Sequence, residues 1–122
     1  RGGALRAQKR AAEAAYDEAA AAYRETVLRG LQEVADALQA LEADARTLQA
    51  CAAAADHARA AREIAEGQVA AGGLSRTAAL EERVREWQAI GERSAAQAAR
   101  HADTAALFHA LGGSAPAADR GE

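Results

Sequence analysis

Residues 69–113 decide how this chain folds, and they read VAAGGLSRTAALEERVREWQAIGERSAAQAARHADTAALFHALGG. Gly72 and Gly73 separate two long alanine-rich stretches, and the second stretch ends at Leu111 and Gly112. Alanine favours helix and glycine ends it, so the pattern predicts a long helix, a tight reversal and a return helix. We expect an all-α fold: a long, coiled-coil-like antiparallel helical hairpin with arms near residues 4–68 and 76–111.

The composition indicates an elongated molecule. Hydrophobic residues make up 50% of the 122 residues, but aromatic residues are only 3%, and roughly a third of the chain is alanine. Burial of one alanine methyl group contributes only about 0.8 kcal/mol, so alanine alone cannot build a thick globular core. Small side chains instead allow helices to pack closely along their whole length.

Charge and hydropathy exclude several classes of protein. The net charge is −3, and no basic stripe with interleaved aromatic residues is present, so we expect no nucleic-acid partner. No apolar run approaches the roughly 20 residues that a membrane-spanning helix needs. The chain begins Arg1-Gly2-Gly3, with neither an initiator methionine nor a signal peptide, so we expect it to be a piece of a longer protein.

Apolar residues recur at alternating steps of three and four in both arms, as in a heptad repeat. We expect these positions to form the packing seam of each arm and to face the partner helix where the two arms overlap. In the first arm they are Tyr16, Ala20, Tyr23, Val27, Leu31, Val34, Leu38, Leu41, Ala45, Leu48, Ala52 and Ala55. In the second arm they are Leu80, Val84, Trp87, Gly91, Ser94, Ala98, His101, Ala105 and Phe108.

The two arms differ in length. Counted back from Gly72, the second arm reaches only to about residue 36 of the first. Residues 5–35 then have no partner within the chain, although an amphipathic helix of that length does not hold an apolar stripe in water by itself. We expect the missing cover to come from further sequence or from other subunits.

Four segments, in order, resemble the TolC-like outer-membrane efflux channels. Residues 23–38, YRETVLRGLQEVADAL, are similar to the family's Y-x-x-x-V-L-x-A-x-Q-E-V-x-D-A-L segment. Residues 2–7, GGALRA, resemble the D-G-G-R-L-R-A entry into its long periplasmic helix. Residues 71–75, AGGLS, resemble the A-G-L-x-S break at the periplasmic tip, and residues 106–113, ALFHALGG, resemble the closing A-L-Y-x-A-L-G-G.

The resemblance implies a role in transport. Members of the family are homotrimers in the outer membrane with a periplasmic α-barrel, and a periplasmic adaptor links the tip of that barrel to an inner-membrane pump. Residues 1–113 would then be a periplasmic helical hairpin from the second repeat of such a channel, and residues 114–122 a disordered C-terminal tail. The outer membrane would be reached through parts outside this chain.

The resemblance also suggests site residues. The adaptor-docking tip would be formed by Ala71, Gly72, Gly73, Leu74 and Ser75. The family's acidic residue after the tip is Ala78 here, and Glu81 and Glu82 are candidates to supply that charge at the pore mouth. The family's aromatic residue at the tip is replaced by Val69, and Ser114 and Ala115 stand where a tryptophan often follows L-G-G.

No other pattern indicates chemistry. His57, His101, His109 and Cys51 lack the spacing of a metal site, and no residues are placed for acid–base or nucleophilic catalysis. We therefore expect no enzyme, cofactor or metal. Ser75 is expected to cap the return helix, with Thr77 as the alternative. Trp87 is expected to pack.

Two alternative functions also agree with part of the sequence. A periplasmic adaptor also carries an alanine-rich hairpin, but its hairpin is flanked by a strand-rich domain. A generic coiled-coil protein would explain the heptads but not the ordered motifs.

Overall fold

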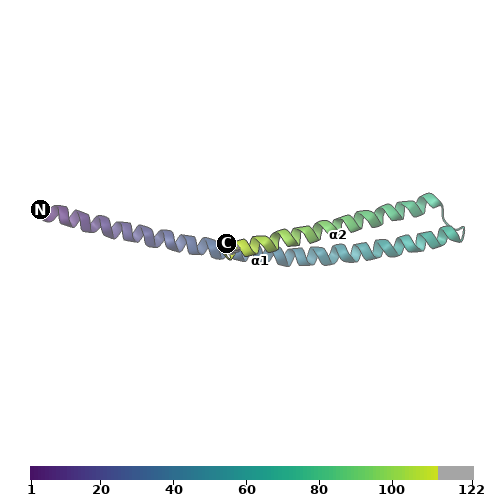
Figure 1. Ribbon diagram of the computed structural model, residues 1–122, viewed down its shortest axis with the longest axis horizontal. Coiled ribbons are helices and arrows are strands. Elements are labelled where there is room, and N and C mark those ends of the chain that lie inside the picture. Colours follow the sequence, from purple (N-terminus) through teal and green to yellow (C-terminus); the bar gives the residue numbers. More distant parts are fainter. Residues whose placement is uncertain (113–122) are drawn as a thin grey trace, which may run out of the picture.

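The computed structural model describes residues 1–112, and within them the chain forms two helices joined by a short turn. Helix α1 runs over Gly2–Ala70 and helix α2 over Arg76–Ala110. The two helices pack side by side in antiparallel orientation (Figure 1). The predicted all-α hairpin is confirmed, with each arm within about two residues of its predicted bounds. The predicted tail at 114–122 lies outside the described residues.

Helix α1 is unusually long for a single helix. Its 69 residues span about 100 Å, and α2 is about half as long. No proline interrupts α1, and Gly30 and Gly67 lie within it without a break. Helix α2 covers only the C-terminal half of α1, so the N-terminal half projects alone (Figure 1).

The contact between the helices follows a heptad repeat built from small residues. Its buried positions are Ala55 and Ala65 on α1 and Ala79, Glu86 and Ala96 on α2. Half-buried positions extend the repeat at steps of three and four. On α1 they include Val34, Ala37, Leu41, Asp44, Leu48, Cys51, Ala58, Arg62 and Val69, and on α2 they include Glu82, Ala89, Arg93, Asp103, Leu107 and Ala110.

The predicted facing positions need correction. On α1, Val34, Leu41, Leu48 and Ala55 do lie against α2, but Leu38 is 53% exposed. On α2 every predicted position lies outside the contact. The residues that do face α1 come one position earlier in the chain, as at Ala79, Glu86 and Leu107. Among the predicted positions, Leu80, Val84, Trp87 and Phe108 stay exposed on α2.

The size of the side chains explains this shift. The distance between two packed helices depends on the side chains at the contact, and alanines allow the closest approach. The prediction followed the bulkiest residues, whereas the most deeply buried apolar residues of the contact are alanines. Trp87, expected to pack, is 63% exposed, so the hairpin leaves it without cover.

Candidate docking site at the hairpin tip

The turn between the helices has a defined backbone geometry. Gly72 has φ +78°, a left-handed conformation that favours glycine. Its N–H donates to the carbonyl of Val69 at 3.0 Å, and the N–H of Gly73 donates to the carbonyl of Gln68 at 2.8 Å. These two bonds form a Schellman motif, which satisfies the last carbonyls of α1 and stops the helix. The predicted reversal at Gly72 is therefore confirmed.

The return helix begins with a side-chain cap. Ser75 is the N-cap of α2, and its Oγ accepts a hydrogen bond from the N–H of Ala78 at 3.2 Å. A capping hydroxyl of this kind satisfies one of the free N–H groups at the start of a helix. The prediction of Ser75 as the cap, rather than Thr77, is confirmed.

The five predicted tip residues lie together at the end of the hairpin. Ala71, Gly72, Gly73 and Ser75 are exposed, whereas Leu74 is half-buried. Leu74 lines a shallow groove together with Ile64 on α1 and Glu81 on α2, among others. The tip therefore presents small side chains and backbone.

The candidate acidic residues Glu81 and Glu82 lie in the second turn of α2, beside this groove. They differ in surroundings. Glu82 is half-buried and accepts a hydrogen bond from Arg85, three residues further along α2. Glu81 is exposed, and the structure gives it no ion pair within residues 1–112. Of the two, Glu81 carries the charge that is open to solvent and to a partner.

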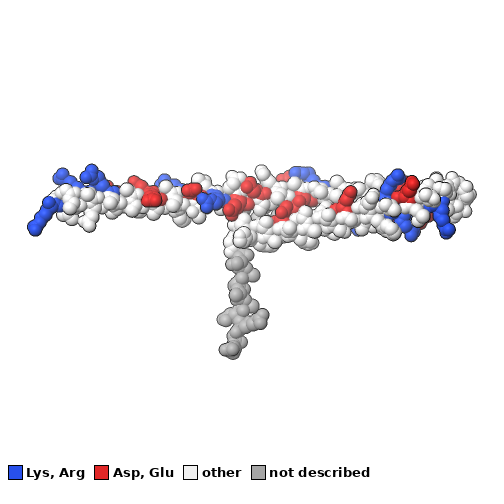
Figure 2. Space-filling view, turned by 90° about the horizontal axis from the view of Figure 1, so that it is seen from above, with Lys and Arg blue, Asp and Glu red and all other residues white. Residues whose placement is uncertain are grey.

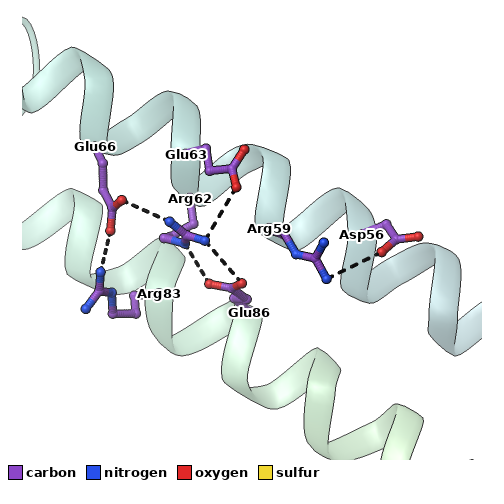
Figure 3. Close-up of polar contacts among 7 residues, drawn as sticks. All are labelled: Asp56, Arg59, Arg62, Glu63, Glu66, Arg83 and Glu86. Carbon is purple, nitrogen blue, oxygen red and sulfur yellow. Dashed lines mark hydrogen bonds and ion pairs between the residues drawn. The ribbon is translucent and has the colours of Figure 1, made fainter.

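A cluster of charged residues joins the helices just behind the tip (Figure 3). We call Arg62 and Glu66 of α1 with Arg83 and Glu86 of α2 the tip ion-pair cluster. Arg62 Nε donates to Glu86 Oε2 at 2.7 Å, and Arg62 Nη1 donates to Glu66 Oε2 at 3.0 Å. Arg83 Nη2 donates to Glu66 Oε1 at 2.6 Å. The four side chains thus alternate in charge and link α1 to α2 twice.

The hydrogen bonds of the cluster stabilise the charged forms of Arg62, Glu66 and Glu86. The hydrogen bond with Glu86 raises the pKa of Arg62. The hydrogen bond from Arg62 lowers the pKa of Glu86, and bonds from Arg83 and then Arg62 lower the pKa of Glu66. Burial opposes all three shifts, so the hydrogen bonds outweigh the loss of solvation.

The apolar repeat in the sequence does not indicate this cluster. Glu86 stands outside the predicted stripe of α2, yet it is only 8% exposed. A signal was available: in an antiparallel hairpin, residues equally far from the turn face each other. Arg62 and Glu86 occupy such positions. The heptad pattern alone treats charged residues as interruptions and does not pair them.

The residues weighed for metal binding lie apart. His57, His101 and His109 are exposed, and Cys51 is half-buried against α2. Within residues 1–112 no group of three or more histidine, cysteine or acidic side chains gathers to hold a metal ion.

Neither α1 nor α2 contains a stretch apolar and long enough to span a membrane. Comparison of the chain with protein-family models, with curated proteins and with solved structures gave no match.

Proposed function

We propose that this chain supplies periplasmic helices to the α-barrel of a TolC-like outer-membrane efflux channel. In this proposal the channel is a homotrimer of non-catalytic subunits. A periplasmic adaptor docks on the hairpin tip and links the channel to an inner-membrane pump. The ordered sequence motifs suggest the family, and the surface of the hairpin supports a role within a larger wall of helices.

The observation that carries the proposal is a second heptad stripe on α2. Helix α2 uses one stripe to contact α1, and a parallel stripe with larger side chains stays exposed beside it. That second stripe includes Leu80 (56% exposed), Val84 (48%), Trp87 (63%) and Phe108 (59%). A helix in a barrel needs two such stripes, because it packs against one neighbour on each side. A two-helix protein that functions alone needs only one.

The uncovered half of α1 supports the same proposal. Large apolar residues recur along it and face solvent: Leu5, Tyr16, Tyr23, Val27, Leu28 and Leu31, between 43% and 76% exposed. Exposed apolar residues in such a series mark a surface for further packing. In the proposed barrel, neighbouring helices would cover this half.

The tip suits close docking. Residues 67–75 contain no charged side chain, and the end of the hairpin at the turn is correspondingly uncoloured in Figure 2. Ala71, Gly72 and Gly73 add little bulk. A helical hairpin of an adaptor could therefore approach the backbone of the turn closely. Glu81, a turn of helix further back, would then lie near the mouth of the pore.

The proposal can be tested in the cells that encode this chain. We expect deletion of the gene to increase accumulation of a fluorescent efflux substrate, and restoration of the gene to reverse that effect. Cell fractionation and chemical cross-linking should place the protein in the outer membrane as a trimer. Restoration with Gly72→Val should leave the trimer in place but abolish efflux, because a β-branched residue does not adopt the backbone of Gly72 at low cost.

Gly73→Ala is the matched control. Gly73 does not have a positive φ, and an added Cβ would meet only the carbonyl oxygen of Gln68 at 3.7 Å, an ordinary contact. This variant should retain efflux. Fractionation with the inner membrane would favour the adaptor alternative, and a soluble protein without effect on accumulation would favour a generic coiled coil. Either outcome would reject the channel role.

A further inference from the structure

A pair of acidic side chains faces across the contact between the helices, far from the tip. Asp44 lies on α1 and Asp103 on α2, and both occupy half-buried positions of the heptad repeat. They stand at nearly equal distances from the turn, which places them opposite each other in the antiparallel pair, and the charge of Asp103 acts on Asp44. The Oδ2 atom of Asp44 is buried and has no hydrogen-bond partner in the described part of the chain.

This arrangement lacks a donor. An ionised carboxylate only accepts hydrogen bonds, so two ionised aspartates cannot bond to each other and repel instead. One proton added to the pair changes that, because a protonated carboxyl donates to the carboxylate beside it. A buried acceptor without a donor is costly, and the proton removes that cost.

The surrounding charges do not neutralise the pair. From α2, the charged groups that act on Asp44 are Asp103 and Arg100, and Arg100 is exposed. On α1, Arg46 lies two residues from Asp44 and pairs with Glu42 at 2.8 Å. Acidic side chains also gather over the middle of the molecule, where the end of α2 meets α1 (Figure 2). The local field therefore favours proton uptake.

We propose that Asp44 and Asp103 form a proton-operated latch. One proton shared between the two carboxyl groups holds the last turns of α2, residues 103–110, on α1, and loss of that proton releases them. The latch is a property of the hairpin itself and does not depend on the proposed role in a channel.

The position of the pair makes a local release possible. Among residues 104–112, only Thr104, Leu107 and Ala110 are half-buried, and α2 ends at Ala110. Terminal turns with few buried contacts open independently of the rest of a fold. The other end of α2 is held by buried alanines and by the tip ion-pair cluster, so it stays closed.

The direction of the titration agrees with the geometry. Burial raises the pKa of Asp44 above its ordinary value of 3.8, the hydrogen bond and charge of Asp103 raise it further, and Arg100 opposes them. When the folded pKa of an acid is raised, its contribution to stability is complete below the unfolded value and is lost as the pH rises through the folded value. The latch therefore closes as the pH falls through the raised pKa of Asp44 and opens as the pH rises through it.

Hydrogen exchange of the full chain tests the latch. Protection factors, corrected for intrinsic exchange, are measured for the backbone amides of residues 104–110 and 79–89 between about pH 4 and about pH 7. We expect protection of residues 104–110 to fall several-fold as the pH rises, while residues 79–89 show no such fall. Asp103→Asn supplies an amide donor in place of the proton, so it should keep residues 104–110 protected throughout.

Two further measurements make the test decisive. Asp56→Asn removes an exposed carboxylate of α1 and should preserve the fall in protection. Carbon-13 NMR of the Asp44 carboxyl should show a titration that Asp103→Asn shifts to lower pH. A pH-independent end of α2 in the unaltered chain, or an unchanged fall in Asp103→Asn, would overturn the latch. Recovery of protection at neutral pH by added Mg²⁺ or Ca²⁺ alone would also overturn it, because the pair would then be a cation site.

Discussion

Arg62 on α1 donates a hydrogen bond from Nε to Oε2 of Glu86 on α2 across 2.7 Å, and Arg62 Nη2 lies 3.4 Å from Oε1 of the same carboxylate. Glu86 is the one buried charged residue in the described part of the chain. The bond therefore joins the two helices at a position where a coiled coil ordinarily places an apolar side chain.

The first prediction concerns this bond. Glu86→Ala should lower the melting temperature by roughly 5–10 °C, because it leaves the half-buried guanidinium of Arg62 without its main partner. Thermal unfolding followed by circular dichroism measures the effect. The matched control is Glu63→Gln, since Glu63 is 61% exposed and its Oε1 lies 3.6 Å from Arg62 Nη2. Equal effects of the two substitutions would contradict a special role for Glu86.

The second prediction concerns the pH dependence of the tip ion-pair cluster. Hydrogen bonds hold the pKa of Glu86 and Glu66 below their ordinary value of 4.5. A lowered folded pKa means that the stability is present above about pH 4.5 and is lost as the pH falls through the folded value. Glu86→Gln should therefore reduce the melting temperature at neutral pH but have little effect near pH 2. An equal reduction at both pH values would argue against a role for the charge.

The third prediction concerns the turn. Gly72→Ala should destabilise the hairpin by about 1–2 kcal/mol, because Gly72 has a positive φ that costs other residues energy. Space is not the cause, since a Cβ at Gly72 would meet nothing within 4 Å. Gly73→Ala should be nearly neutral in the same denaturation experiment. Substitutions of equal cost would contradict the strain argument.

The fourth prediction concerns self-association. The exposed apolar residues between Tyr16 and Leu31 should make the isolated chain self-associate or melt at low temperature. Sedimentation at several concentrations measures the association, and Tyr16→Glu with Tyr23→Glu should weaken it. Glu substitution at Ala14 and Ala21, two exposed positions of the same helix, is the control. A compact monomer that melts cooperatively would contradict the prediction.

The hairpin and its turn could be predicted because they depend on local signals. Absence of proline, abundance of alanine, the glycines at the turn and Ser75 each act through nearby backbone. The facing positions could be predicted only in part. Leu41 and Leu48 follow the heptad, but Trp87 does not lie in the contact, because the buried apolar residues of α2 are Ala79 and Ala96.

The contacts that give the hairpin its chemistry could not be predicted from periodicity. Arg62 and Glu86 are 24 residues apart, and the pairing of Asp44 with Asp103 spans still more of the chain. Each pairing depends on the rotation of one helix against the other. Rotating one helix about its axis by one residue brings different side chains into the contact. A small error in the predicted rotation is therefore enough to miss both pairs.

The continuity of α1 has a mechanical consequence. One unbroken helix carries both the half that contacts α2 and the half that projects alone, so the rotational phase of the two halves is fixed. A partner that grips the projecting half and twists it applies a torque that the backbone hydrogen bonds transmit over about 100 Å to the turn at Gly72. The long helix therefore couples rotation of its free end to rotation of the tip.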